Sequence, residues 1–204
     1  MDRIPVAVLV SGGGTNLQAI LDAGASGVIR DAEIAVVISD RPGARALERA
    51  EKAGVPCMLL DRKAMDRKAW EAELEKALGA YRIQLVVLAG FLTILSPEMT
   101  KRWDHRILNV HPSLIPAFCG QGMYGLKVHE AALNRGVKVT GATVHFVNEI
   151  PDGGEIVAQR AVEVRSGDTP EVLQRRVMEE AEWKLLPEAV QELARRMREE
   201  GGQV

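Results

Sequence analysis

Two polar side chains with chemical potential lie two residues apart in the stretch Ile107-Leu-Asn-Val-His-Pro-Ser-Leu-Ile-Pro116. On a β-strand, Asn109 and His111 would point to the same face. Pro112 cannot donate a ladder hydrogen bond, which predicts that the strand ends at His111. An amide and a titratable imidazole facing one space could stabilise a developing oxyanion and move a proton. The alternative is a buried polar pair satisfied by backbone groups.

A carboxylate that could join this pair lies downstream, in the turn Pro151-Asp-Gly-Gly154. Asp152 beside His111 would favour the imidazolium form and hold the ring in one orientation. The sequence alone does not bring the two together, because the turn is far from the strand along the chain. Asn109, His111 and Asp152 are therefore the candidate catalytic residues.

The other three histidines fit this role less well. His105 is expected in a polar, solvated turn, and His129 near the start of a helix with a structural role. The strand parity of His145 could place it on the face opposite Val144 and Phe146.

The two cysteines, Cys57 and Cys119, form neither a disulfide framework nor a metal-binding pattern. Cys119 has no basic neighbour that would activate its thiol, and Cys57 reads as a small core residue. We therefore predict that neither cysteine is a metal ligand or a nucleophile.

A glycine-rich turn near the N-terminus could hold an anion. In Ser11-Gly-Gly-Gly-Thr-Asn16, an apolar run precedes the glycines and a helical pattern follows them. Leu17 stands where a dinucleotide fingerprint needs its third glycine, and no lysine completes a nucleoside-triphosphatase loop. A short nest remains, with Thr15 and Asn16 as further donors, suited to one phosphate monoester. The alternative is a plain glycine turn between a strand and a helix.

Apolar runs alternate with helical patterns along the chain, which predicts an α/β fold. We expect a doubly wound, mostly parallel, Rossmann-like sheet in a three-layer αβα arrangement, as a single domain over residues 1–204. The expected strands are 5–10, 33–39, 56–60, 85–89, 107–110, 140–147 and 155–164. The expected helices begin near residues 17, 44, 66, 97, 128 and 170, and Pro187 is expected to kink or divide the last one.

Two loops of the predicted fold could form walls of a binding site. The apolar loop 90–97 follows a strand, and open α/β sheets bind ligands at that end of their strands. Its alternative role is to cover the core. The segment 117–125 contains three glycines and is expected to be mobile.

The composition is that of an ordinary globular protein. The formal net charge of −2 gives no basic excess, so we expect no nucleic-acid partner. No stretch approaches the about 18 apolar residues of a membrane span, and the N-terminal residues lack the features of a signal peptide. A cytoplasmic protein that does not bind membranes is expected.

Five segments together resemble the folate-dependent glycinamide ribonucleotide formyltransferase family. They begin with Val8-Leu-Val-Ser-Gly-Gly-Gly-Thr-Asn-Leu-Gln-Ala-Ile20 and Val87-Leu-Ala-Gly-Phe-Leu-Thr-Ile-Leu-Ser-Pro97. Leu108-Asn-Val-His-Pro-Ser-Leu-Ile-Pro116, Thr143-Val-His-Phe146 and Asp152-Gly-Gly154 follow. Their order and spacing agree with the family from about residue 5 to about residue 190. The Asn-x-His-Pro-Ser-Leu core is shared by the wider formyltransferase family.

The resemblance implies substrates and residue roles. Gly14, Thr15 and Asn16 would hold the 5-phosphate of glycinamide ribonucleotide, and Glu182 would contact its amine. Asn109, His111 and Asp152 would catalyse formyl transfer from 10-formyltetrahydrofolate, a co-substrate that requires no metal. The residues implied to contact the folate are Arg67, Leu92, Thr93, Ile94, Leu95 and Asn109. The pterin would lie partly between residues 92–95 and the loop 148–152.

Two features depart from the family pattern. Thr93 stands where the family often has arginine. A threonine cannot make the charged contact that an arginine would make to the glutamate tail of the folate. The loop 117–125 is longer than in the shorter family members. The resemblance leaves the choice between a monomer and a homodimer open.

Several other functions remain alternatives. A 10-formyltetrahydrofolate hydrolase resembles the same catalytic core but uses water as the acceptor, and usually carries an extra N-terminal domain. A methionyl-tRNA formyltransferase would need a further C-terminal domain and a basic surface. A nicotinamide-dependent oxidoreductase would need a glycine where Leu17 stands. It would also need an acidic residue at the end of the second strand, for which Asp40 is the only candidate. A non-catalytic nucleotide-binding module would leave Asn109, His111 and Asp152 unexplained.

Overall fold

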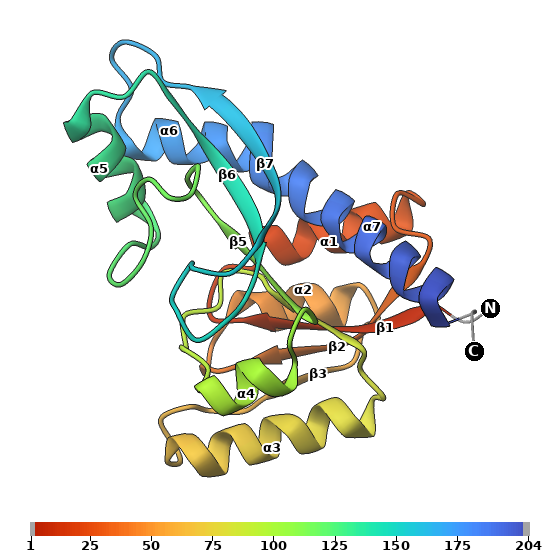
Figure 1. The fold of residues 1–204 in the computed structure, drawn as a ribbon. Coiled ribbons are helices and arrows are strands. Elements are labelled where there is room, and N and C mark those ends of the chain that lie inside the picture. The colour runs from red at the N-terminus through yellow and green to blue at the C-terminus, as the bar shows by residue number, and fades with distance from the viewer. Residues whose placement is uncertain (1–2, 202–204) are drawn as a thin grey trace.

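The computed structural model describes residues 3–201, and its strands form one seven-stranded sheet (Figure 1). The strands are β1 (Ile4–Val10), β2 (Ala32–Ser39), β3 (Cys57–Leu59), β4 (Leu85–Leu88), β5 (Ile107–His111), β6 (Val139–Phe146) and β7 (Ile156–Glu163). Their order across the sheet is β3-β2-β1-β4-β5-β6-β7. The first five strands run parallel, and β6 is antiparallel to both neighbours. The predicted doubly wound, mostly parallel α/β fold is confirmed.

Helices cover both faces of this sheet, as the three-layer prediction requires. They are α1 (Thr15–Ala25), α2 (Arg45–Lys52), α3 (Arg67–Ala80), α4 (Pro97–Arg102), α5 (Leu126–Arg135), α6 (Pro170–Val177), the π-helix η1 (Met178–Glu182) and α7 (Trp183–Gly201). One apolar cluster joins the sheet to α1, α2, α5, α6 and α7, and a second joins the other face to α3 and α4. Figure 1 shows α3 and α4 together on one side of the sheet.

The core forms where the sequence is most continuously apolar. From Val6 to Val10, β1 is fully buried, because helices pack on both of its faces. Trp70 anchors α3 to the second cluster and is also fully buried. Its indole N–H donates a hydrogen bond to the Leu60 carbonyl at 2.7 Å, so burial leaves no unpaired donor there. Asp66 caps the same helix by accepting from the Ala69 amide.

The last helical region divides at a different place from the one predicted. Pro187 lies inside α7, and the break is the π-helix η1 just before that helix. Pro187 has no N–H to donate to the preceding helical turn. The π turn of η1, just upstream, already changes the backbone hydrogen-bonding pattern before the chain reaches Pro187. Division of the helix at Pro187 is therefore wrong, while a kink at Pro187 stays a prediction. Glu182 becomes the last residue of the π turn.

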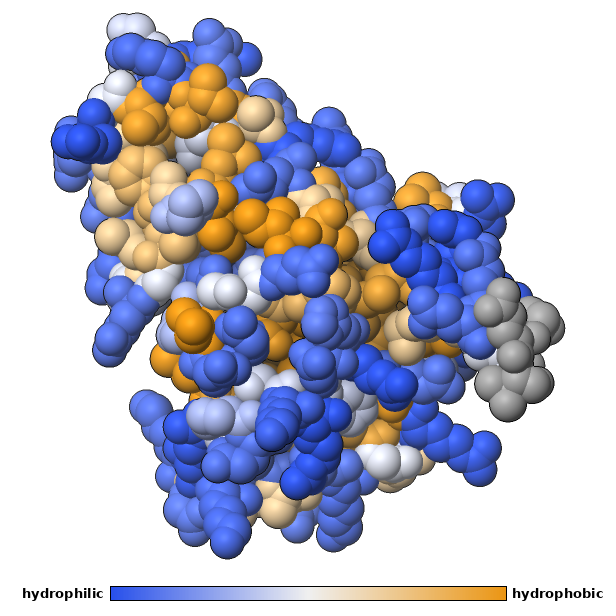
Figure 2. Space-filling model, viewed as in Figure 1, coloured by the Kyte–Doolittle hydropathy of each residue, from blue (hydrophilic) through white to orange (hydrophobic). Residues whose placement is uncertain are grey.

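The surface differs between the two ends of the sheet. Figure 2 shows hydrophilic side chains over the α3 and α4 layer and hydrophobic residues gathered over β6 and β7. Val139 and Ile156, at the ends of these strands, have large exposed fractions. Among the described helices, none is long and apolar enough to cross a membrane. That residues 1–204 form a single domain stays a prediction.

Candidate active site

The three predicted catalytic residues lie together at the carboxyl end of β5. The strand ends at His111, as Pro112 predicts, and the turn containing Asp152 approaches it. His111 Nδ1 lies 3.4 Å from Asp152 Oδ2, and only 4% of the histidine surface is exposed. Asp152 adopts a left-handed φ of 57°, a conformation that aspartate and asparagine tolerate better than most residues.

The loop 117–125 closes over this pair through its backbone. His111 Nε2 donates to the Phe118 carbonyl at 2.9 Å, and the Gly120 amide donates to Asp152 Oδ2 at 2.8 Å. The carboxylate and the carbonyl are both acceptors, so an imidazolium with a proton on each nitrogen suits this geometry. His111 must exchange its bond to Phe118 before Nε2 can reach another acceptor.

His145 completes a cluster that the sequence interpretation undervalued. It pairs with Asn109 across the antiparallel strands β5 and β6. His145 Nδ1 donates to the Phe146 carbonyl at 2.8 Å, and its Nε2 lies 3.1 Å from Asn109 Nδ2. Asp152 Oδ1 lies 3.6 Å from the same nitrogen. The parity of His145 was visible in the sequence, but its register against Asn109 was not.

The surroundings keep Asp152 ionised. Burial by itself would raise its pKa, but contact with His145, the charge of His111 and the Gly120 hydrogen bond together lower the pKa below its ordinary value. A carboxylate that stays charged can orient His111 through the contact with Nδ1. This electrostatic arrangement is suited to general acid catalysis by the imidazole.

His129 is a buried neighbour of this cluster, and its ring is neutral at neutral pH. It lies on α5, fully buried, and neither ring nitrogen has a hydrogen-bond partner within residues 3–201. Burial, together with the charge of His111, lowers its pKa from 6.5 to about 4. The expected structural role of His129 fits this neutral, enclosed ring.

His129 should make the stability of the protein depend on pH. Between about pH 6.5 and pH 4 its ring takes up a proton in the unfolded state but not in the folded state. The free energy of unfolding is therefore expected to fall on acidification across this window, by at most about 3 kcal/mol. Urea unfolding at pH 7 and pH 5 measures this change. In His129→Leu the difference should shrink, and an unaltered difference would refute the assignment.

The glycine turn and Glu182 meet at the start of α1. This helix begins at Thr15, earlier than predicted, so Thr15 and Asn16 belong to its first turn. Asn16 Nδ2 donates to Glu182 Oε2 at 2.7 Å, although the two residues are 166 positions apart. Thr15 Oγ1 lies 3.8 Å from Met178 Sδ. The backbone amides and Thr15 are therefore better placed than the Asn16 side chain to receive an anion.

Glu182 is itself an unusual carboxylate. It is 6% exposed, and burial raises its pKa to about 7, although the hydrogen bond from Asn16 opposes that rise. Its place in a π turn is notable because such turns occur often at functional sites. Glu182 can change charge near neutral pH at the edge of the glycine turn.

A separate cavity of about 570 Å³ lies beside the loop 90–97. Its lining residues are Arg62, Lys63, Met65, Arg67, Leu92, Thr93 and Ile94. The structure brings together most of the predicted folate contacts, and Arg67 Nη2 donates to the Ile94 carbonyl at 3.0 Å. Leu95 does not line this cavity, because it turns inward and is buried in the second apolar cluster. This cavity combines apolar side chains with the cationic groups of Arg62, Lys63 and Arg67.

Thr93 and Asp40 form a buried polar contact at this cavity. Thr93 Oγ1 donates to Asp40 Oδ2 at 2.6 Å, and Asp40 is almost fully buried. The Thr93 hydroxyl is thereby engaged with the protein. Arg62 and Lys63 supply positive charge on the same wall, which was not anticipated from the sequence.

Neither the two cysteines nor His105 has the properties of a residue of the catalytic cluster. Burial raises the pKa of both thiols, and the charge of Asp152 raises that of Cys119 further, which disfavours a nucleophilic thiolate. His105 is exposed, and hydrogen bonds to Asp104 and Glu155 raise its pKa. Among residues 3–201, no group of three or more histidine, cysteine or acidic residues is arranged to hold a metal ion.

Comparison with known proteins identifies relatives that cover nearly the whole chain. The Formyl transferase family model matches residues 4–190. A phosphoribosylglycinamide formyltransferase from Haemophilus influenzae is 41% identical over 186 residues, 89% of this chain and 83% of that protein. The crystal structure of glycinamide ribonucleotide transformylase 1 from Symbiobacterium toebii is 47% identical. Its TM-score is 0.88, over 95% of this chain and 88% of that one.

Two further relatives set these matches in context. The trifunctional purine biosynthetic protein adenosine-3 of Gallus gallus is 42% identical over 95% of this chain, but the match covers only 19% of that protein. A formyltetrahydrofolate deformylase from Pseudomonas syringae is 28% identical, with a TM-score of 0.85, and the match covers 62% of that chain. Identity and coverage are both higher for the transformylases of similar length. The chain therefore belongs to the formyl transferase family, among the phosphoribosylglycinamide formyltransferases.

Proposed function

We propose that this protein transfers the formyl group of 10-formyltetrahydrofolate to the amine of 5'-phosphoribosylglycinamide, in de novo purine biosynthesis. The observation that carries the proposal is the cluster of Asn109, His111 and Asp152 at the carboxyl end of β5. The glycine turn with Glu182 and the cavity at loop 90–97 also lie where α/β sheets bind ligands. These features provide places for two substrates and a proton donor.

The catalytic residues have distinct roles in the proposed reaction. Asn109 and protonated His111 stabilise the oxyanion that develops when the amine attacks the formyl carbon. His111, directly or through a water molecule, donates the proton that N10 of the folate needs in order to leave, and the proton that the attacking amine loses restores the imidazolium. Asp152 keeps His111 charged and oriented, and His145 holds the Asn109 amide. Holding the amine and the formyl carbon of the two bound substrates in line increases the rate of transfer further.

The ribonucleotide is proposed to bind between the glycine turn and the π turn. Gly14, Thr15 and Asn16 lie at the positive end of α1, where backbone amides favour a phosphate. Asn16 reaches this site through its backbone amide, since its side chain holds Glu182. The Glu182 carboxylate accepts a hydrogen bond from the glycinamide amine.

The folate is proposed to occupy the cavity lined by Arg67, Leu92, Thr93 and Ile94, and to reach toward Asn109. The acidic tail of the folate would lie against Arg62, Lys63 and Arg67, which offsets the absence of an arginine at position 93. Leu95 supports this wall from the core. A cytoplasmic location and a monomeric or homodimeric state stay predictions.

A deformylation assay tests the function directly. The protein is mixed with 10-formyltetrahydrofolate, and loss of the formyl group is followed with and without 5'-phosphoribosylglycinamide. Deformylation that requires the ribonucleotide is expected. Deformylation that proceeds equally without it would instead favour a 10-formyltetrahydrofolate hydrolase, the alternative to which the deformylase relative points.

Glu182 should make binding of the ribonucleotide depend on pH. Because its pKa is about 7, the carboxylate is mostly charged at pH 8 and mostly neutral at pH 6. KM for the ribonucleotide is expected to rise up to about tenfold over this drop. In Glu182→Gln, KM should be higher at pH 8 and should vary less with pH. Equal pH profiles of KM in the two proteins would contradict the role of Glu182.

A further inference from the structure

The glycine turn is fastened to α2 by two hydrogen bonds. The Gly12 carbonyl accepts from the Ala46 amide at 3.1 Å, and the Gly13 carbonyl accepts from Arg49 Nε at 2.8 Å. Gly14 adopts a left-handed φ of 73°, and a Cβ atom there would lie 2.7 Å from the Ala46 Cβ. The turn is thus packed closely onto α2 and held in one conformation.

These bonds also determine where the amides of the turn point. In a trans peptide unit, the carbonyl and the following N–H point to opposite sides of the chain. Holding the carbonyls of Gly12 and Gly13 toward α2 therefore turns the amides of Gly13 and Gly14 away from α2. Within residues 3–201, neither amide has a hydrogen-bond acceptor. Arg49 controls the peptide that presents the Gly14 amide, next to the first turn of α1.

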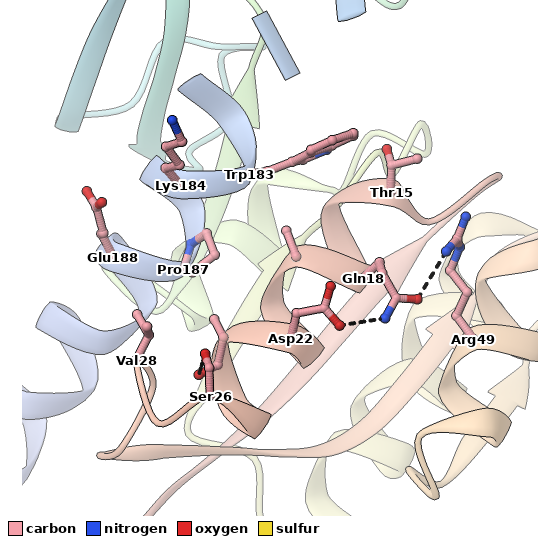
Figure 3. Close-up of a pocket in the computed structure, with 12 residues that line it drawn as sticks. Thr15, Gln18, Asp22, Ser26, Val28, Arg49, Trp183, Lys184, Pro187 and Glu188 are labelled. Atoms are coloured by element: carbon pink, nitrogen blue, oxygen red, sulfur yellow. Dashed lines mark hydrogen bonds between the residues drawn. The ribbon is translucent and has the colours of Figure 1, made fainter. Parts of the chain in front are cut away.

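Arg49 is itself held in place by side chains of α1. Its Nη1 donates to Gln18 Oε1 at 3.0 Å, and Gln18 Nε2 donates to Asp22 Oδ1 at 2.9 Å. Figure 3 shows this chain of side chains, with Thr15 at the same end of the cleft between α1 and α7. The guanidinium is thus pre-oriented and brings a fixed positive charge to the anion-binding turn.

We propose that Arg49 is a positioning residue for the phosphate of the substrate. It fixes the Gly13–Gly14 peptide so that its amide faces the anion, and it adds a positive charge behind the turn. This inference rests on the proposed function, because it assumes that the turn binds the phosphate of the ribonucleotide. Arg49 acts through Gly13 and takes no part in proton transfer.

Steady-state kinetics of Arg49→Met test the proposal, because methionine keeps the aliphatic stem but removes the donor and the charge. KM for the ribonucleotide is expected to rise about tenfold or more, with kcat and KM for the folate nearly unchanged. With glycinamide riboside, which lacks the phosphate, kcat/KM should be the same in the variant and the wild type. An equal loss of kcat/KM for both substrates would overturn the proposal.

Two control variants separate positioning from general damage. Arg45→Met removes the same charge from an exposed position one turn earlier on α2, and it should leave KM unchanged. Arg49→Lys retains a charge and a donor, and its KM should lie between those of wild type and Arg49→Met. A lysine variant as impaired as the methionine variant would assign the loss to packing and overturn the proposal. Thermal unfolding confirms that each variant is folded.

Titration with inorganic phosphate tests Arg49 without the reaction. Phosphate is expected to shift the amide NMR signals of Gly13 and Gly14 in the wild type, with about tenfold weaker binding in Arg49→Met. If phosphate binds in this way but the protein does not transfer the formyl group, the proposed function is refuted and the role of Arg49 in anion binding is kept. Wild-type protein whose turn does not bind phosphate, or equal binding in both proteins, would refute the role of Arg49.

Discussion

Replacing His111 with alanine is expected to lower kcat for formyl transfer about a thousandfold. The substitution removes the proposed proton donor and one of the two groups that stabilise the oxyanion, and each such contribution is commonly worth about a hundredfold or more. Ground-state contacts at the glycine turn and at the cavity beside loop 90–97 remain, so KM for both substrates should change by less than about fivefold. Single-turnover measurement of deformylation in the presence of the ribonucleotide gives the rate directly.

His105→Ala provides a matched control for His111→Ala. His105 is an exposed histidine outside the catalytic cluster, so this variant should keep the wild-type kcat. The unfolding temperature of His111→Ala must also be measured, because the substitution leaves Asp152 without its nearest cation. A folded His111→Ala protein with more than about a tenth of the wild-type rate would remove His111 from the mechanism.

Replacing Asp152 with asparagine is expected to lower kcat about a hundredfold, with a smaller effect on KM. Asparagine tolerates the left-handed φ of 57° and can still accept the hydrogen bond from the Gly120 amide. The substitution therefore removes mainly the charge beside His111 Nδ1. Without that charge the imidazolium is less favoured, so the remaining activity should decline at a lower pH than in the wild type.

The pH dependence of kcat distinguishes this role of Asp152 from a purely structural one. A structural defect would lower kcat equally at every pH, whereas loss of the charge should shift the profile. Asp104→Asn is the control, since Asp104 is an exposed carboxylate beside His105. Unchanged turnover across the pH range in Asp152→Asn would reject the assignment.

The proposed catalytic role of Asp152 depends on two competing electrostatic effects. Burial disfavours its charge, while the contacts with His145, His111 and Gly120 favour it more strongly and lower the pKa. Glu182 shows the opposite balance, because it is more deeply buried and Asn16 is the one donor that opposes the rise of its pKa. The two carboxylates therefore differ in charge near neutral pH, which matches the roles proposed for them: Asp152 would orient His111, and Glu182 would receive the amine.

The sequence by itself determined the order of strands and helices and the face shared by Asn109 and His111. These features depend on residues close in the chain: continuous apolar runs mark buried strands, strand periodicity is two, and Pro112 ends the ladder. The turn chemistry around Asp152 and the glycines at the start of α1 were equally local. Residue types in these places were enough to predict the chemistry and, with the family resemblance, the substrates.

Only the tertiary structure decided which distant side chains meet. Asn109 faces His145 because β5 and β6 pair in one antiparallel register, and a one-residue shift would turn His145 to the other face. The π turn brings Glu182 to Asn16, while Leu95 turns into the core instead of joining the cavity wall. Arg49 reaches Gly13 because α2 packs against the turn at Gly14. Such contacts depend on sheet order, register and helix packing, which no local pattern of residues encodes.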